Sequence, residues 1–172
     1  MPIAVPSRLA AYRDRLGAFG FAATIADAEL PDCPIIWAND RFFELTGYPP
    51  EEILGRNCRF LQPGYVCPHA RTSIREALAT ETSTDVLLAN ARRDGRVFIN
   101  HLLIRPLAAR SRLVIGAPHD VSANVTLNTA AHGPTYQFLT EPPDIADRMQ
   151  AHRSGVLARW VRLLHDCAVA SG

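Results

Sequence analysis

The sequence predicts an α+β domain in which helices pack on one face of a five-stranded antiparallel sheet. Two strand-like segments come first, a run of short helices follows, and three longer strand-like segments come last. A composition of 48% apolar and 20% charged residues with a formal charge of +1 is typical of one compact globular core. Such an arrangement leaves room for a ligand between the sheet and its helices.

An amphipathic helix is expected over residues 1–20, ahead of the core. Apolar residues recur there at helical spacing between a serine that suits an N-cap and a terminating glycine: Ser7, Leu9, Tyr12, Leu16, Phe19 and Gly20. The segments "FAATIA" and "PIIWA" then predict two paired strands, because the prolines and aspartates between them favour a turn. Short helices are expected from Asn39 to about Leu54, broken by Gly47 and two prolines.

The second half of the core repeats the strand pattern after one longer helix, "HARTSIREALAT". The segments "DVLLANARRDGRVFINHLLIRPL" and "RLVIGAPHDVS" predict three strands, the first two joined at Asp94–Gly95. Residues 21–122 therefore form the predicted core domain. Residues 123–172 are expected to hold a loop-rich linker and a helix with an apolar stripe: Ile145, Met149, Val156, Trp160, Leu163 and Leu164.

Composition excludes several classes of function. All eighteen basic residues are arginines, so no lysine can form a Schiff base. In residues 123–172 four arginines are balanced by four acids, which favours packing or dimer formation over binding of nucleic acid. No signal peptide and no apolar run of about 18 residues is evident, so we expect a cytoplasmic protein without membrane contact.

The four cysteines do not form a metal or disulfide pattern. Cys33, Cys58, Cys67 and Cys167 are scattered without a CxxC pair. Cys67 and His69 are two conceivable ligands, but no second pair stands at a usual spacing, so no metal is expected.

The octet "GRNCRFLQ", residues 55–62, places Cys58 between two amides and beside an arginine. Taken alone, a single cysteine is more often a small core residue. With "LPDCPIIWANDRFFELTGYPPEEILGRNCRFLQ", "IREAL", "NARRDGRVFINHLLI" and "VIGAPHDVS", however, residues 21–122 resemble the LOV (light-oxygen-voltage) photoreceptor domains, a flavin-binding branch of the PAS fold. No effector domain follows, so the chain is similar to a short LOV protein.

The resemblance implies a noncovalently bound flavin, usually FMN, with FAD or riboflavin as the other candidates. Blue light would make the thiol of Cys58 bond to ring carbon C4a, and the adduct would break in the dark. Cys58 is thus a photochemical nucleophile and the protein is not expected to be an enzyme. A buried thiol in apolar surroundings has a raised pKa, which suits a sensor that must not react in darkness.

The resemblance also implies roles for other side chains. Two arginines would bind the flavin phosphate, two amides would bind the ribityl chain and ring edge, and two asparagines would bind the pyrimidine end: Arg59 and Arg75, Asn57 and Gln62, Asn90 and Asn100. Arg71 is a further phosphate candidate because it precedes Arg75 by one helical turn. Four apolar residues are expected to form the slot around the ring: Ile25, Leu61, Leu102 and Ile104.

Pro118 departs from the family pattern. LOV domains usually carry there a glutamine whose amide contacts the flavin and relays the signal, whereas proline has no amide side chain and no backbone donor. We expect Pro118 also to break a ladder contact in a central strand. Signalling would then take another route, with neighbouring His119 as one candidate, or the adduct lifetime would be unusual.

The sequence therefore predicts a blue-light sensor whose output is a rearrangement of its flanking helices. The two terminal stripes expose apolar area unless they pack on the sheet or on a partner, which favours a homodimer and a separate downstream signalling protein. A flavin-based redox sensor or a flavin-dependent oxidoreductase, with Cys58 incidental, is the alternative.

Overall fold

The computed structural model describes residue 9, residues 16–62, 68–107 and 112–122, the backbone of 125–128 and 135–138, and residues 147, 150–156 and 158. Its core is a five-stranded antiparallel sheet with the spatial order β2-β1-β5-β4-β3. The strands are β1 (Thr24–Asp27), β2 (Ile35–Ala38), β3 (Thr84–Ala91), β4 (Val97–Pro106) and β5 (Leu113–Asp120). The predicted α+β fold is confirmed, and β5 is its central strand.

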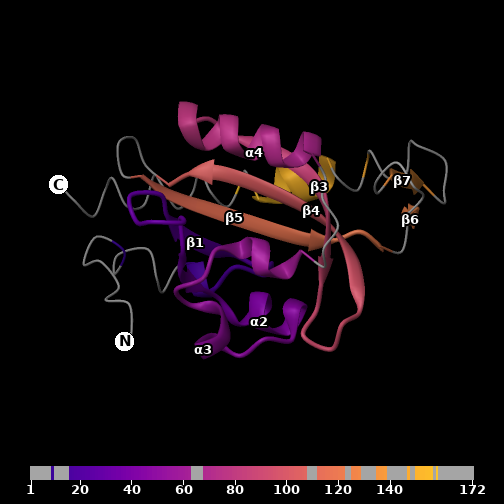
Figure 1. Ribbon diagram of the computed structural model, residues 1–172, viewed down its shortest axis with the longest axis horizontal. Helices are drawn as coiled ribbons and strands as arrows, with labels where there is room; N and C mark the ends of the chain where they lie inside the picture. Colours follow the sequence, from indigo (N-terminus) through magenta and orange to yellow (C-terminus); the bar gives the residue numbers. More distant parts are fainter. Residues whose placement is uncertain are drawn as a thin grey trace.

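Four helical segments connect the two halves of the sheet. They are α2 (Asp40–Thr46), α3 (Pro50–Ile53), the 3₁₀ turn η1 (Cys58–Leu61) and α4 (Pro68–Thr80). Figure 1 shows α4 at the top of the view and α2 and α3 at the bottom, with the strands between them.

Local sequence explains where α2 begins and ends. The side chain of Asn39 caps its first turn by accepting from the backbone N–H of Phe42, and Gly47 ends it in a left-handed conformation with φ of 73°. Glycine adopts that conformation without the steric cost that a side chain carries. These caps fix the length of α2 at two turns, as the breaks at Gly47 and the prolines predict.

Strict alternation divides the sheet residues between two faces. On β4 and β5 the even-numbered Asn100, Leu102 and Gly116 face α4 and α2, while the odd-numbered Leu103 and Ile115 belong to a core cluster on the other face. Both faces of β4 are buried over most of its length. Each central strand therefore contributes to two separate environments.

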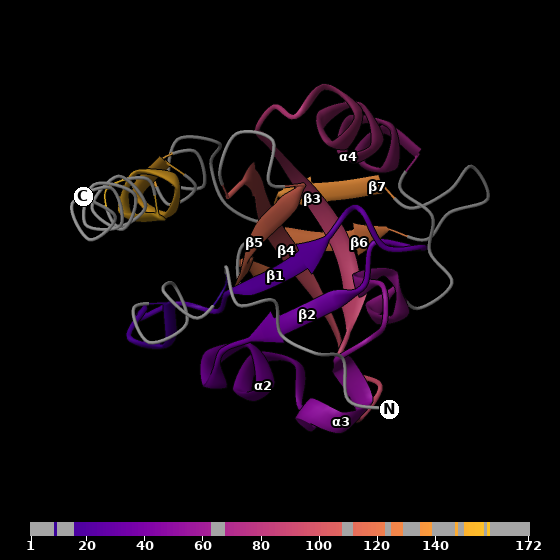
Figure 2. The same cartoon turned by 90° about the vertical axis from the view of Figure 1, so that its left-hand side faces the viewer.

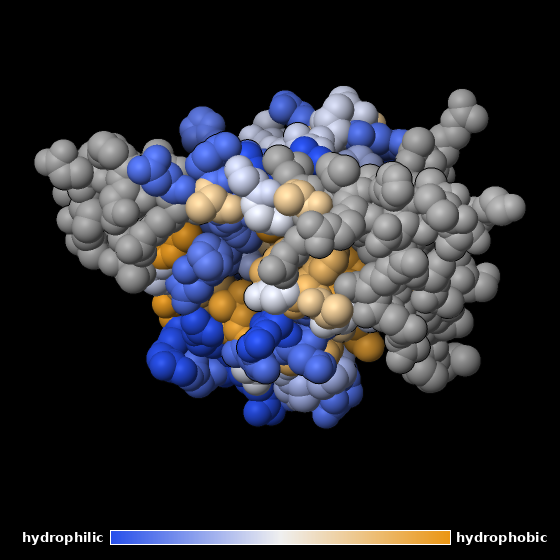
Figure 3. Space-filling model, turned by 180° about the vertical axis from the view of Figure 1, so that it is seen from behind, coloured by the Kyte–Doolittle hydropathy of each residue, from blue (hydrophilic) through white to orange (hydrophobic). Residues whose placement is uncertain are grey.

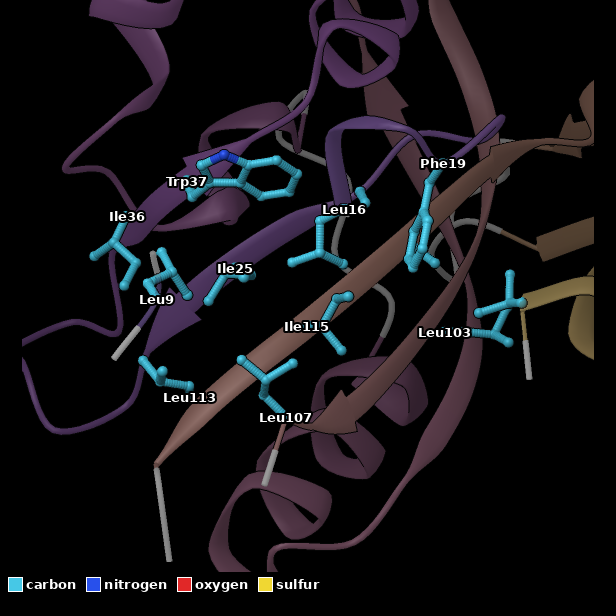
Figure 4. Packing of buried hydrophobic residues seen from close by; sticks show 13 residues of the cluster. Leu9, Leu16, Phe19, Ile25, Ile36, Trp37, Leu103, Leu107, Leu113 and Ile115 are labelled. Atoms are coloured by element: carbon cyan, nitrogen blue, oxygen red, sulfur yellow. The ribbon is translucent and has the colours of Figure 1, made fainter. Parts of the chain in front are cut away.

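The outer face of the sheet is covered by the described residues of the two chain ends. Leu9, Leu16 and Phe19 pack with Val156 and the strand residues there, and Leu9 and Leu16 are fully buried. Figure 4 shows these N-terminal side chains over the strands, beside Ile25, Leu113 and Ile115. The apolar stripes that predicted a dimer are thus used, as far as they are described, to cover the protein's own sheet; Tyr12, Ile145, Met149, Trp160, Leu163 and Leu164 lie outside the described residues.

A second, two-stranded sheet was not predicted. Strands β6 (Val125–Asn128) and β7 (Thr135–Phe138) pair antiparallel, within the segment expected to be a loop-rich linker. Figure 2 shows this pair apart from the yellow helical residues near the C-terminus.

None of the helices in the described ranges has the length and apolarity needed to cross a membrane.

Candidate functional site

A cavity of about 470 Å³ lies between the sheet, α4 and the segment from α2 to η1. This volume is within the range of small-molecule and cofactor sites. Every predicted site residue except Ile25 lines it: Asn57, Cys58, Arg59, Leu61, Gln62, Arg71, Arg75, Asn90, Asn100, Leu102, Ile104 and Pro118. The structure therefore brings together residues that are up to about sixty positions apart in the chain.

Ile25 was wrongly predicted to line the pocket. It is fully buried in the outer-face cluster, opposite Ile115 of β5. Its neighbours Thr24 and Ala26 face the cavity instead, because successive strand residues point to opposite faces.

Cys58 is the first residue of η1, and its side chain is accessible at the cavity. The surrounding protein nevertheless desolvates the thiol enough to raise its pKa, and the nearby charge of Arg59 offsets this only in part. The thiol is therefore held in its neutral, unreactive form within reach of whatever fills the cavity.

Asn57 holds the loop that carries Cys58. Its carbonyl oxygen accepts from the backbone N–H of Arg59 at 3.0 Å and caps η1, while its amide donates to the backbone oxygen of Asp32. Asp32 and Cys33 both have positive φ angles, 69° and 47°, which non-glycine residues seldom adopt. Asn57 thus fixes a strained turn against the base of the cavity.

Cys33 is a second thiol in the same cavity. Desolvation raises its pKa to about 11, and the proximity of Cys58 adds to the shift. Two neutral thiols therefore share the cavity wall.

Arg71 and Arg75 occupy one face of α4, one turn apart, and both line the cavity. Neither guanidinium has an ion-pair partner within the described ranges. Arg59 on the other side of the cavity pairs with Asp32, and both of these side chains are about half exposed. Three guanidinium groups at one cavity suit an anionic group such as a phosphate.

Asn90 and Asn100 lie on adjacent strands at the far side of the cavity, and both are buried. The amide of Asn100 donates to the carbonyl oxygen of Asn90 at 2.8 Å, and its own carbonyl oxygen accepts from the backbone N–H of His119 at 3.1 Å. The amide of Asn90 donates to the backbone oxygen of Ala89. This network holds both side chains in position at the cavity.

Gly116 lines the cavity from the centre of β5. A Cβ atom at this position would lie 2.9 Å from Oγ1 of Thr24, closer than real Cβ contacts. The absence of a side chain here therefore leaves room for the hydroxyl of Thr24 at the cavity wall.

Pro118 also lines the cavity, but it does not break the β4–β5 ladder as expected. The backbone N–H of His119 points toward Asn100 of β4, so the nitrogen of Pro118 faces the opposite side. The ladder between β1 and β5 ends at Thr24 and Gly116, before it reaches the proline. No strand hydrogen bond is lost, because the ring stands where β5 has no partner on that side.

Among the described residues, no cluster of His, Cys, Asp and Glu is arranged to hold a metal ion. Cys67, one of the two conceivable ligands, lies outside those residues.

Comparisons with known proteins agree on the family. Residues 24–123 match the PAS domain family. A blue-light-activated histidine kinase of Rhizobium johnstonii is 41% identical over 112 residues, which are 62% of this chain and 32% of that protein. The chain therefore spans about a third of this relative's length.

Two solved structures extend the comparison. A LOV protein of Rhodobacter sphaeroides is 27% identical with a TM-score of 0.73, covering 92% of this chain and 83% of that one. An RNA-binding light-oxygen-voltage receptor is 36% identical with a TM-score of 0.60, covering 71% of this chain and 36% of that one. The likeness to the Rhodobacter protein includes residues on both sides of the matched domain.

Proposed function

We propose, from the premise that the chain belongs to the PAS domain family and is a LOV domain within it, that it senses blue light through a bound flavin. The observation that carries the proposal is the single cavity that gathers Cys58, three arginines and the paired asparagines. A sensor role, rather than an enzymatic one, is proposed because the cavity residues suit binding and one reversible thiol reaction.

The donor set of the cavity fits a flavin mononucleotide. Leu61, Leu102 and Ile104 give apolar walls for a flat ring, and the buried amides of Asn90 and Asn100 offer donors and acceptors to its polar end. Such buried amides would satisfy ring carbonyl and imide groups without water.

The phosphate end would lie toward α4 and η1. No described acid neutralises the charges of Arg71 and Arg75. Arg59 would either leave Asp32 and bind the phosphate, or bind Asp32 and the phosphate together. Gln62, which ends η1, would contact the ribityl chain from the same side. FMN is therefore proposed over riboflavin, which has no phosphate.

When bound, the flavin would supply light absorption and an excited ring that accepts the thiol proton and an electron, after which the sulfur of Cys58 bonds reversibly to carbon C4a. The protein's part is to hold that thiol neutral and close. Desolvation keeps the pKa of Cys58 raised, and the Asn57 cap fixes the start of η1. The thiol of Cys58 would therefore stay unreactive in darkness.

The test is reversible bleaching of the flavin absorption by blue light, with two cysteine variants. We expect wild type and Cys33→Ala to bleach and recover, and Cys58→Ala to bind flavin without bleaching. Cys33→Ala is the matched control because both thiols line the cavity and both have raised pKa values. Unchanged bleaching of Cys58→Ala would instead support a redox sensor or a flavin oxidoreductase, and a colourless protein would refute flavin binding.

We further propose that adduct formation is read out by the flanking helical residues, through a changed homodimer contact and a separate signalling partner. Figure 3 shows apolar side chains reaching the surface on the rear face, above the mainly polar surface over α2 and α3. Such a surface suits contact with a second copy. RNA binding is not proposed, although one similar structure is of an RNA-binding receptor, because a net charge of +1 gives little attraction to phosphates.

A further inference from the structure

Three histidines meet on the outer face of the sheet, away from the cavity. His101 of β4 and His119 of β5 lie directly opposite each other in the strand register, and both occupy odd-numbered positions that alternation places on this face. His152 belongs to the C-terminal helical segment, residues 150–156, and packs over them. Figure 2 shows this segment in yellow beside β5, across the strands from α4.

The contact of His152 with the sheet is aromatic. Its ring stacks on that of His119 with centroids 4.6 Å apart and an interplanar angle of 18°. It also lies 5.3 Å from the ring of His101, tilted by 60°, and 6.4 Å from Phe21, edge to face. Among the described residues, ring packing and not a hydrogen bond from His152 therefore holds the segment on β5.

Two other contacts anchor the same segment. The guanidinium of Arg153 pairs with Asp85 of β3 at 2.5 Å, and Asp85 also bonds Nε2 of His101 at 3.0 Å. Val156 is buried in the outer-face cluster. The segment thus contacts three strands, and the imidazole stack forms its centre.

His119 connects this stack to the cavity. Its backbone N–H donates to Asn100, which in turn donates to Asn90, and both asparagines line the cavity. Pro118, the preceding residue, lines the cavity. It also lines a second, open hollow whose wall includes residues of the C-terminal helical segment. A shift of Asn100 therefore acts on the residue whose ring carries His152.

A proton on His152 would find no acceptor among the described residues, whereas the ring of His119 is exposed. Nε2 of His152 and Nδ1 of His101 are buried and, within the described ranges, have no hydrogen-bond partner. Desolvation lowers the pKa of His152 to about 4, and the neighbouring charges of His119, His101 and Arg153 add to the effect. Desolvation likewise lowers the pKa of His119, with His101 adding to the shift and Asp120 opposing it in part.

The acidic groups near the stack already have partners. Asp85 pairs with Arg153 and His101, Asp120 pairs with Arg92 at 2.6 Å, and Glu44 in the wall of the hollow pairs with Arg41 at 2.9 Å. These carboxylates are already paired, and of the three only Asp120 acts on His119, where it partly offsets the lowered pKa. An added proton on His152 therefore repels its neighbours instead of forming an ion pair.

We propose that His119 and His152 form a proton-sensitive joint that docks residues 150–156 on the sheet and links them to Asn100 in the cavity. While both rings are neutral the segment stays docked, and a proton on either ring releases it. The link to the cavity rests on the proposed function, because a flavin contacting Asn100 would be what moves the joint. The docking itself is independent of any flavin.

The pH window follows from the direction of the shifts. A histidine with a depressed pKa in the docked state stabilises docking fully above its ordinary value of 6.5, and the stabilisation is lost as pH falls toward about 4. Because His152 is partly exposed and solvent screens its interactions, we expect about a tenfold loss of the docking constant between pH 7.5 and 5.

Hydrogen–deuterium exchange of the full chain in darkness tests the joint. The protection factor of residues 150–156 is measured at both pH values against an unstructured peptide of the same sequence, with the amides of β4 as a check on global folding. We expect protection of the segment to fall about tenfold at pH 5 while β4 stays protected. A fall of less than twofold in the wild type would overturn the proposal.

Three variants distinguish the effect of histidine protonation from the other contacts that hold residues 150–156 on the sheet. His152→Phe keeps an aromatic ring without a titrating nitrogen, so its protection should stay near the pH 7.5 level at both pH values. Arg153→Gln should lower protection at both pH values and keep a fall at pH 5, somewhat smaller than tenfold because the Arg153 charge no longer adds to the shift of His152. His119→Phe serves as a second test if His152→Phe fails to fold. A tenfold fall persisting in the phenylalanine variant, or a ratio lost in Arg153→Gln, would refute the histidine joint.

The effect of light is tested by the same exchange measurement on flavin-loaded protein at pH 7.5. Illumination should change the protection of residues 150–156 at least threefold in the wild type and less than twofold in His119→Ala, with both proteins bleaching. Bleaching without a change in the wild-type segment would refute the link to the cavity. If neither protein bleaches, the proposed function is refuted. The exchange measurements in darkness at the two pH values still test whether the histidine joint exists.

Discussion

The side chain of Asn100 connects β4 to both neighbouring strands at the cavity. Replacing it by alanine would remove the donor to the buried oxygen of Asn90 and the side-chain acceptor of the His119 N–H. We expect Asn100→Ala to lower the free energy of unfolding by about 2 to 4 kcal/mol. Asn90→Ala should cost less, because it removes one acceptor from Asn100 and leaves the His119 bond intact. Urea unfolding measures both, and an equal or smaller loss for Asn100→Ala would contradict the network.

The two cavity thiols should make stability depend on alkaline pH. A thiol with a raised pKa favours folding below its ordinary value of 9.0, and this contribution of Cys33 is lost as pH rises toward about 11. We expect the free energy of unfolding to fall between pH 9 and 11, less steeply in Cys33→Ser. Unfolding series across that range provide the measurement, and an identical slope in wild type and variant would contradict the raised pKa.

The resemblance to LOV domains was enough to predict most of the cavity, because its motifs, with the octet around Cys58 among them, mark side chains that one ligand can contact. Ile25 was placed wrongly since its apolar character suits both faces of the sheet, and only the register with Ile115 decides between them. The strained turn that carries Cys33 was not predicted, because it depends on backbone conformation, which no periodicity indicates.

At the scale of single elements, Asn39 joins α2 to the chain before β1. Its carbonyl oxygen accepts from Ala23 at 2.9 Å and from Phe42 at 3.1 Å, and its amide donates to Phe21 at 2.9 Å. We expect Asn39→Ala to reduce the free energy of unfolding by about 2 to 4 kcal/mol, because a helix cap and two longer-range bonds are lost together.

Asn39→Asp is the matched control for that cap. Aspartate keeps both acceptor bonds and loses only the donation to Phe21, so thermal or urea unfolding should give it a smaller loss than alanine. The cap would have no special role if the two variants proved equally destabilised.

Elements with strong local signals were predicted well, including the turn at Asp94–Gly95 and the helix over α4. The β6–β7 pair was missed because both strands are only four residues long and β7 lies within "NTAAHGPTYQFLTEPPD", which contains residues typical of loops. The expected disruption at Pro118 was wrong for a related reason. Its cost depends on which side of β5 lacks a partner, and this is a property of the sheet rather than of the proline.

For the molecule as a whole, the oligomeric state remains the sharpest prediction. We expect light scattering of the flavin-loaded full chain to give the mass of a dimer in darkness or in light, with the two states differing. Cys58→Ala should give the dark value under both conditions, because it cannot form the bond that biases the helices. A monomer in both states of the wild type would contradict the proposed dimer.

The apolar stripes near the two ends of the chain do not by themselves determine the oligomeric state. Their apolar spacing predicts burial but does not distinguish a partner's surface from the protein's own sheet. Leu9, Leu16 and Val156 are buried on that sheet within one chain. Any dimer contact must therefore use other surface, or release these residues first.

Successive residues of β4 and β5 serve different tasks: Asn100 and Pro118 face the cavity, while His101 and His119 face the C-terminal segment. A single residue inserted near the start of β4 would turn its histidine inward and its asparagine outward. The strand is thus intolerant of length changes that a surface loop would accept, and ligand recognition and helix docking would fail in the same mutant.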